Sequence, residues 1–189
     1  MSIIQGRLID AINAEKRRIA VLMIDEADRP INRNPNAKRR AISILQMNQL
    51  EVISACVNKK PLIVDIRFCP WASSNMVEPI VDNVLEFTKK EANAFKSEFN
   101  GVSLHDELQR QQIKVLVVMG YHVNACVVST VGANKGLKGI DLGSDKGALQ
   151  NGYHVMTCPQ ILHGSEITVE ERNKSWDYTY DSLEFYMQT

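Results

Sequence analysis

The stretch Lys114-Val-Leu-Val-Val-Met-Gly-Tyr-His-Val-Asn-Ala-Cys-Val-Val-Ser-Thr130 decides the fold that this sequence predicts. It begins with an apolar run at 115–119, typical of a buried strand, and Gly120 then breaks the pattern. Cys126 follows where the next helix would begin, and the positive end of a helix dipole favours the thiolate over the thiol. We therefore interpret the stretch as a strand, a sharp turn and a nucleophilic cysteine. The alternative is a cysteine buried for packing alone, which is common.

Composition sets broad limits on function. The chain has 189 residues, of which 44% are hydrophobic and 23% charged, values that suit one globular domain with a sizeable core. Its formal net charge is zero, so nothing predicts nucleic acid or an anionic membrane as a partner. No apolar run approaches the roughly 18 residues of a membrane span, and we see no signal peptide. The four scattered cysteines form no CxxC pair, so we expect reduced thiols and a cytoplasmic protein.

Strands and helices alternate along the chain. Apolar runs predict strands at 19–24, 62–66, 85–88, 115–119 and 153–158. Helical spacing predicts helices at 3–16, 38–58 and about 104–111, with another that opens at 126. This alternation predicts a three-layer α/β fold, in which a doubly wound and mostly parallel sheet is flanked by helices. We expect residues 1–189 to form a single domain, with an N-terminal helix at about 1–17.

Three segments of the chain carry weaker patterns. Residues 26–37, with Pro30 and Pro35, are expected to form a loop. Residues 136–150 are too glycine-rich for one undisturbed helix, since each glycine inside a helix costs about 1 kcal/mol. The C-terminal tail at about 164–189 interleaves aromatic and polar residues, which could pack on the sheet or on another subunit.

Three polar residues follow the ends of predicted strands: Asp25, Lys89 and Cys126. The carboxyl ends of parallel strands lie on one edge of a sheet, where open α/β sheets place their ligands. A cysteine nucleophile needs a base for its proton, and a nearby cation lowers its pKa further. The three side chains could supply these roles, although Asp25 could also be a helix cap and Lys89 an ordinary exposed lysine.

The chain resembles the isochorismatase-like cysteine hydrolase superfamily, which includes nicotinamidases, carbamoylsarcosine amidases and isochorismatases. Residues 19–25, Ile-Ala-Val-Leu-Met-Ile-Asp, resemble the family's first strand and its catalytic aspartate. Residues 89–95, Lys-Lys-Glu-Ala-Asn-Ala-Phe, are similar to the pattern around its lysine and select Lys89 over Lys90. Residues 117–130 resemble the glycine and Cys-Val signature around the nucleophile.

The resemblance implies a catalytic triad of Asp25, Lys89 and Cys126. Cys126 would attack a carbonyl carbon, Asp25 would carry the proton to the leaving amine, and water would hydrolyse the thioester. Lys89 would stabilise the thiolate. The family also has a non-proline cis peptide, which maps to Tyr121–His122. The backbone N–H groups of His122 and Cys126 would form the oxyanion hole.

The sequence also departs from parts of the family pattern. Nicotinamidases carry an Asp-x-His…His metal cluster after the second strand, but residues 65–71 read Asp-Ile-Arg-Phe-Cys-Pro-Trp without histidine. We therefore expect neither a metal nor another cofactor. True isochorismatases usually lack the cysteine, so its presence favours hydrolysis of an amide or related C–N bond. Phe68, Trp71 and Phe95 are the predicted substrate-binding residues, while a core role fits Phe68 and Trp71 equally well.

Three hypotheses remain open at this point. The first is a metal-independent hydrolase that acts on non-peptide C–N bonds of a small amide-like substrate. The second is a catalytically silent member of the superfamily that serves as a small-molecule binding or scaffolding protein. The third is a different doubly wound fold with a structural cysteine. Under the first two hypotheses we expect a small-molecule ligand and a homo-oligomer, and a dimer and a tetramer are equally open.

Overall fold

Continuous apolar runs build the middle of the sheet. The structure is a computed structural model, and it describes residues 3–25, 35–67, 84–88, 91–121, 126–132 and 146–163. In β1 (Ile19–Ile24) no residue exposes more than 1% of its surface, because other strands flank it on both sides and helices cover it. Such a strand has no solvent-facing side, which explains why its sequence lacks the alternation of a half-buried strand.

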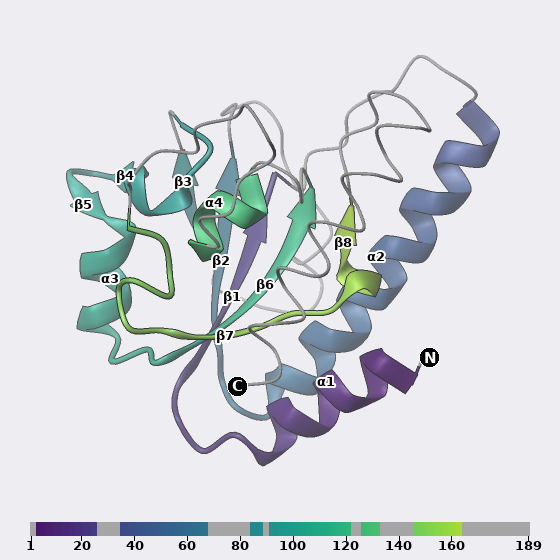
Figure 1. The fold of residues 1–189 in the computed structure, drawn as a ribbon, viewed down its shortest axis with the longest axis horizontal. Coiled ribbons are helices and arrows are strands. Elements are labelled where there is room, and N and C mark those ends of the chain that lie inside the picture. The colour runs from purple at the N-terminus through teal and green to yellow at the C-terminus, as the bar shows by residue number, and fades with distance from the viewer. Residues whose placement is uncertain are drawn as a thin grey trace.

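In the described part of the chain the sheet has eight strands, in the order β5-β4-β3-β2-β1-β6-β7 with β8 also paired to β6 (Figure 1). Strand pairing is parallel in β1-β2, β1-β6, β2-β3, β6-β7 and β6-β8. It is antiparallel in β3-β4 and β4-β5. The remaining strands are β2 (Leu62–Arg67), β3 (Val84–Thr88), β4 (Glu98–Phe99), β5 (Val102–Ser103), β6 (Val115–Tyr121), β7 (His154–Met156) and β8 (Leu162–His163).

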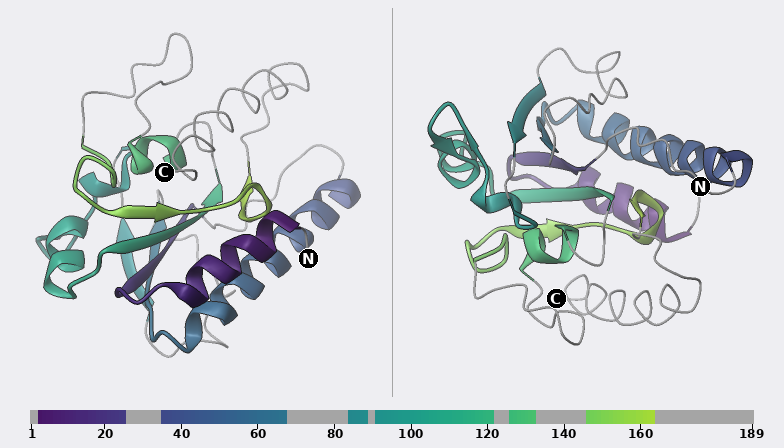
Figure 2. Two further views of the ribbon diagram at one scale, coloured as in Figure 1. Left: turned by 60° about the horizontal axis from the view of Figure 1, so that its bottom comes forward. Right: turned by 90° about the horizontal axis from the view of Figure 1, so that it is seen from above.

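Helices complete the layers on either side of this sheet. The α-helices are α1 (Ile3–Ala14), α2 (Pro35–Val57), α3 (Leu104–Arg110) and α4 (Val128–Val131), and the short 3-10 helices are η1 (Ala94–Lys96) and η3 (Pro159–Ile161). Figure 2 shows α1 beside α2, and α4 on the opposite side of the sheet from α2. The side-chain amide of Gln49 on α2 donates to the Ile161 carbonyl at 3.1 Å and so ties α2 to η3. The predicted three-layer, mostly parallel α/β fold is therefore confirmed.

Several element boundaries differ from the sequence-based prediction. The α2 helix begins at Pro35, inside the predicted loop 26–37, because proline already has a helical φ and no N–H is needed in a first turn. The β4-β5 hairpin was not predicted, since two-residue strands carry no readable alternation. Most of the glycine-rich segment 136–150 and the whole tail 164–189 lie outside the described residues, so their predicted structures and the single-domain organisation stay predictions.

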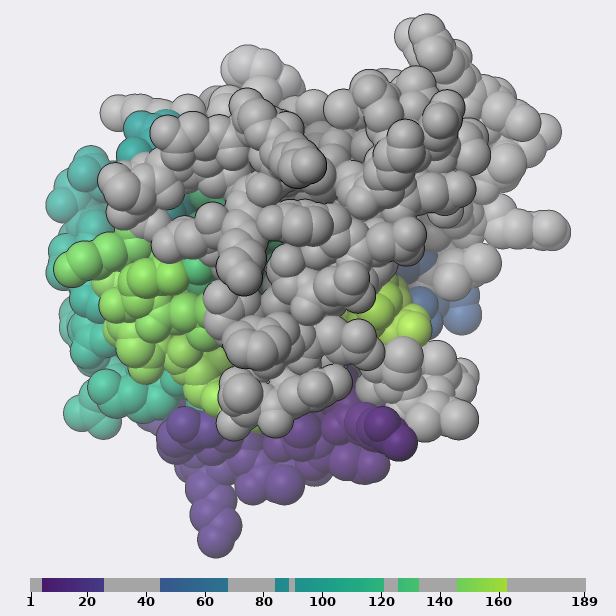
Figure 3. All heavy atoms as spheres, in the orientation of Figure 1, coloured from purple at the N-terminus to yellow at the C-terminus, as the bar shows by residue number. Residues whose placement is uncertain are grey.

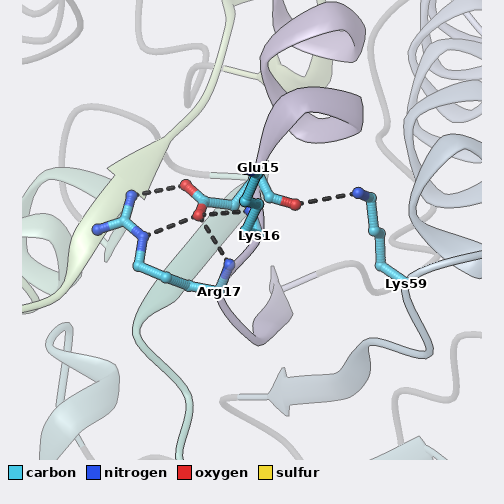
Figure 4. A network of polar contacts seen from close by, with 4 residues as sticks. All are labelled: Glu15, Lys16, Arg17 and Lys59. Carbon is cyan, nitrogen blue, oxygen red and sulfur yellow. Dashed lines mark hydrogen bonds and ion pairs between the residues drawn. The ribbon is translucent and has the colours of Figure 1, made fainter.

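A polar network ties the loops at the amino ends of β1 and β2 together (Figure 4). The Glu15 carboxylate accepts hydrogen bonds from the Arg17 guanidinium, with Nε at 2.8 Å and Nη2 at 2.6 Å. It also accepts from the backbone N–H groups of Lys16 and Arg17. Lys59 Nζ donates to the carbonyls of Asn13 and Glu15 at 2.8 and 3.0 Å, which joins the end of α1 to the segment that follows α2.

Within the described part of the chain, no helix has the length and apolar character that a membrane span requires.

Candidate active site

The order of the strands draws attention to their carboxyl ends. From β1 the chain proceeds to β2 on one side, whereas β6 pairs with the other side of β1. At such a reversal of strand order in an open α/β sheet, ligands commonly bind beyond the carboxyl ends of the strands. The carboxyl ends of β1, β2, β3 and β6 lie at this edge, because these strands pair in parallel.

Asp25 lies directly beyond the last residue of β1. Its side chain is buried, with 7% of the residue exposed, and its backbone N–H donates to the Ile66 carbonyl of β2 at 2.8 Å. Its φ of 54° falls in the left-handed region, which costs a non-glycine residue on the order of 1 kcal/mol. The hydrogen bond keeps Asp25 beside β2.

Gly120 lets the β6 backbone approach β1 closely at this edge. It pairs with Ile24 in the sheet, and its φ is 131°. A Cβ at this position would lie only 2.1 Å from the Ile24 carbonyl oxygen, so any side chain would force the two strands apart. The break in the apolar pattern of 115–119 is thus explained by close contact. It places Tyr121 next to the turn at Asp25.

Cys126 lies just before α4, the helix that follows β6. Cys126 and Val127 have π-helical conformation and run directly into α4, and π-helical segments are frequent at functional sites. The Cys126 residue is 7% exposed. Since α4 spans only Val128–Val131, its dipole is small.

Two segments hold α4 in place from outside. The backbone N–H of Ala94 in η1 donates to Thr130 Oγ1 at 3.0 Å, which connects α4 to the segment after Lys89. Residues 146–153 hold its other end, where Gln150 Nε2 donates to the Gly132 carbonyl at 2.7 Å. Figure 3 shows this segment, in light green, at the molecular surface beside the teal of α3. The cysteine-bearing turn is therefore supported by two parts of the chain that are distant in sequence.

A buried charge cluster, Asp65, Arg67 and Glu86, occupies the same edge. Asp65 is 1% and Arg67 8% exposed, and the Arg67 guanidinium is ion-paired with Asp65 through Nη2. Arg67 Nε donates to Asp65 Oδ2 at 2.7 Å, and Nη2 donates to Glu86 Oε1 at 2.8 Å. Burial raises the pKa of the Asp65 carboxyl, Arg67 opposes that rise, and the nearby charges of Glu86 and Asp25 add to it. Asp25 and Asp65 therefore interact electrostatically across the ends of β1 and β2.

The sequence analysis did not select Asp65 and Arg67 as site residues. A signal for them was present, since both interrupt an otherwise apolar buried strand at alternate positions of Leu-Ile-Val-Asp-Ile-Arg. Charged side chains in such a strand require partners, and burying them serves no packing purpose. The sequence shows this pattern, but it does not show that Arg67 is ion-paired with Asp65 and Glu86.

Several predicted site residues lie outside the described residues: Lys89, Phe68, Trp71 and His122. In the sequence Lys89 directly follows β3, whose last residue Thr88 pairs with Arg67. All peptide bonds between described residues are trans, and the predicted cis bond Tyr121–His122 falls outside this set. The triad geometry and the oxyanion hole therefore stay predictions.

Phe95 is described, and it belongs to an aromatic cluster. Its ring centroid lies 5.7 Å from that of Tyr153 and 6.5 Å from that of His105. Tyr153 Oη in turn lies 3.1 Å from His105 Nδ1. His154, the residue after Tyr153, pairs with Val115 at the amino end of β6. The ring contacts with Tyr153 and His105 explain Phe95 as a packing residue. Its role in substrate binding stays a prediction.

Two other cysteines differ from Cys126 in their surroundings. Cys56 and Cys158 are fully buried, and burial raises their pKa to about 12 and about 11, respectively. Both therefore remain protonated and unreactive near neutral pH.

Asp65 and Arg67 do not fit a metal site. The Asp65 carboxylate is ion-paired with Arg67 through Oδ2, and the positive charge of Arg67 would repel a metal beside it. In the described ranges, no group of at least three His, Cys, Asp or Glu residues has a metal-binding arrangement. Metal independence itself remains a prediction.

Sequence comparisons find no relative: no family model matches the chain, and neither does any curated protein. Structural comparison does find similar folds. An isochorismatase-like hydrolase from Alkaliphilus metalliredigens superposes with a TM-score of 0.61 at 18% identity, over 92% of both chains. The nicotinamidase SaPncA from Staphylococcus aureus gives a TM-score of 0.60 at 12% identity, over 89% of this chain and 95% of that one.

A third similar structure is the N-carbamoylsarcosine amidase from Thermoplasma acidophilum, with a TM-score of 0.58 at 12% identity over 87% of this chain and 91% of that one. At these identities the likeness establishes the fold and not the activity. The chain has the isochorismatase-like α/β fold. The similar structures represent the same superfamily that the sequence resembles.

Proposed function

We propose that this protein is a hydrolase that cleaves the C–N bond of a small amide-like substrate with Cys126 as its nucleophile. The observation that carries this proposal is the arrangement at the carboxyl edge of the sheet. The strand register sets Ile24 against Gly120. Asp25 directly follows the first of these strands, and Cys126 precedes the helix that comes after the second in sequence. The amidases and hydrolases with similar folds add support through the fold alone.

The proposed reaction has two halves. In the first, the Cys126 thiol gives its proton to the Asp25 carboxylate and its sulfur bonds to the carbonyl carbon. The tetrahedral intermediate collapses, the C–N bond breaks, and Asp25 returns the proton to the leaving nitrogen. In the second, Asp25 takes a proton from water, the hydroxide attacks the thioester, and the C–S bond breaks. The products are a carboxylic acid and ammonia or an amine, and the thiol recovers its proton.

Lys89 completes the proposed triad. Its position after β3 puts it in sequence beside Thr88, whose strand partner Arg67 lies next to the Asp25 turn. A lysine ammonium there would stabilise the thiolate form of Cys126 and orient Asp25. The backbone N–H groups of His122 and Cys126 are the proposed oxyanion hole, with the Tyr121–His122 bond shaping the turn between them.

The experiment that tests this function is a screen of small primary amides for released ammonia, with wild-type protein and its Cys126→Ala variant. We expect release with at least one amide, and we expect the variant to lose activity by a factor of about 10⁴ or more. In parallel, iodoacetamide should label Cys126 stoichiometrically near neutral pH. If the thiol labels no faster than an ordinary cysteine and no amide is cleaved, the protein is a catalytically silent member of this fold.

A further inference from the structure

The Arg67 guanidinium lies at the same sheet edge as Asp25, and the described residues use only part of its hydrogen-bonding capacity. Arg67 is the last residue of β2, and the backbone of its neighbour Ile66 accepts the hydrogen bond from Asp25. The side chain is 10% exposed, so it is held rather than mobile. Its Nε and Nη2 atoms contact Asp65 and Glu86. Among the described residues, no acceptor contacts its third nitrogen, Nη1.

Packing alone does not account for this cluster. Taking an arginine and an aspartate out of water is unfavourable, and the ion pair offsets this only when the remaining polar atoms are also satisfied. Here they are not, because within the described part of the chain Asp65 Oδ1 is buried and accepts no hydrogen bond. Apolar residues of similar volume at 65 and 67 would continue the pattern of the neighbouring buried strand β1 and avoid both shortfalls.

The orientation of the guanidinium suggests what it does. Two carboxylates fix Arg67 on its Nε and Nη2 side, which leaves the two N–H groups of Nη1 as the part that can donate elsewhere. Glu86 is 61% exposed, so solvent screens its charge, whereas the guanidinium is mostly shielded. A rigid, partly desolvated cation binds a charged acceptor oxygen more strongly than a neutral one.

We propose that Arg67 is a substrate-binding residue that holds a carboxylate on the substrate, with Asp65 and Glu86 as the residues that position it. This inference rests on the proposed function and narrows it. The substrate class is a small amide that also carries a carboxylate. The amide carbon would lie at Cys126 and the carboxylate at Arg67.

Matched pairs of amides test this assignment by binding alone. In a Cys126→Ala background, which prevents turnover, isothermal titration calorimetry compares malonamate with propionamide, succinamate with butyramide, and glutaramate with valeramide. In each pair a methyl group replaces the carboxylate. The three pairs differ in chain length, so the test does not depend on one particular distance between the amide and the carboxylate. We expect at least one carboxylate to bind about tenfold or more tightly than its methyl partner.

The variant series then assigns that preference to Arg67. Arg67→Met alone leaves the buried Asp65 charge without a partner, so the decisive variant is the double change Asp65→Asn with Arg67→Met, which removes the pair together. The preference should fall to about twofold or less in this variant, and Arg67→Lys should retain part of it. Arg110→Met is the matched control, since Arg110 is 67% exposed and paired with Glu107 on α3. Circular dichroism and thermal melts establish that each variant is folded.

The outcomes separate the two proposals. Equal binding within every pair, a preference that survives in the folded double variant, or no binding of any carboxylate up to about 10 mM would each overturn the role of Arg67. Selective binding without ammonia release by protein with Cys126 intact would support Arg67 and refute the hydrolase. Equal hydrolysis of both members of a pair would support the hydrolase and refute the role of Arg67.

Discussion

The amino and carboxyl ends of the central strands carry similar charged groups in opposite conditions. At the amino end, the Glu15 and Arg17 pair is local in sequence, Arg17 is about half exposed, and the Glu15 carboxylate accepts four hydrogen bonds from Lys16 and Arg17. At the carboxyl end, Asp65 and Arg67 are almost fully buried, and one oxygen of Asp65 accepts no hydrogen bond from a described residue. Both oxygens of Glu15 therefore accept hydrogen bonds, whereas Asp65 Oδ1 accepts none from the described residues.

Backbone conformation does not separate the two ends. At the amino end, Lys59 donates to two backbone carbonyls and joins the links before β1 and β2, and the next residue, Lys60, has a left-handed φ of 48°. At the carboxyl end Asp25 has a left-handed φ of 54°, and the φ of Gly120 is 131°. The difference between the two ends therefore lies in burial and hydrogen bonding. Buried groups without hydrogen-bond partners are expected where a protein requires special geometry for function, which supports the proposed site at the carboxyl end.

The largest expected effect follows from Asp25→Asn. Asparagine tolerates the left-handed conformation as well as aspartate does, so the turn should persist while the proton acceptor is lost. Ammonia release should fall about 1000-fold or more, and the rate of Cys126 labelling should also fall. Chemical denaturation should show a change of less than about 1 kcal/mol, since removing the charge also relieves repulsion with Asp65. Unchanged turnover would remove Asp25 from the mechanism.

Gly120→Ala should produce the largest loss of stability. The new Cβ would meet the Ile24 carbonyl oxygen at 2.1 Å, so β1 and β6 must separate, at an expected cost of more than about 3 kcal/mol. Gly152→Ala is the matched control, because Gly152 has φ 80° but no atom within 4 Å of its Cβ position. It should cost only about 1 kcal/mol. Urea denaturation compares the two, and similar losses would show that φ alone explains the need for glycine at 120.

Cysteine labelling compares Cys126, at the carboxyl edge of the sheet, with Cys56 and Cys158 in the core. In a Cys69→Ser background, iodoacetamide at pH 7 should modify Cys126 and leave Cys56 and Cys158 intact in folded protein. Their pKa values of about 12 and about 11 leave almost no thiolate at that pH. Peptide mass spectrometry locates the label, and labelling in denaturant confirms that all three thiols are present. Modification of Cys56 or Cys158 in folded protein would contradict their place in the core.

The smallest effect is expected at the amino end. Hydrogen bonds from the Arg17 side chain lower the pKa of Glu15 from 4.5 to about 2, against the opposing effect of burial. Because the folded-state pKa is depressed, this stabilisation is present above pH 4.5 and is lost as the pH falls toward 2. Glu15→Gln should therefore lower the unfolding free energy at pH 7 by less than about 1 kcal/mol, and by less still near pH 3. Thermal melts at both pH values measure this, and ammonia release should be unchanged.

Much of the fold was predictable because its signals are local. The apolar runs at 19–24, 62–66 and 115–119 predicted the central parallel strands, and their boundaries hold within two residues. The same runs placed Asp25 and Cys126 beyond strand ends that proved to be on one edge. The β4-β5 hairpin escaped prediction because each of its strands has only two residues, too few for a pattern.

The sequence by itself determined which residues follow which strands, and hence that an aspartate and a cysteine come after strand ends. Only the tertiary structure decided that β1 lies between β2 and β6, because strand order depends on packing between segments far apart in sequence. It likewise decided why residue 120 is glycine, through a backbone contact with Ile24, and that Arg67 pairs with Asp65 and Glu86. These are contacts across strands, and a linear pattern carries no record of them.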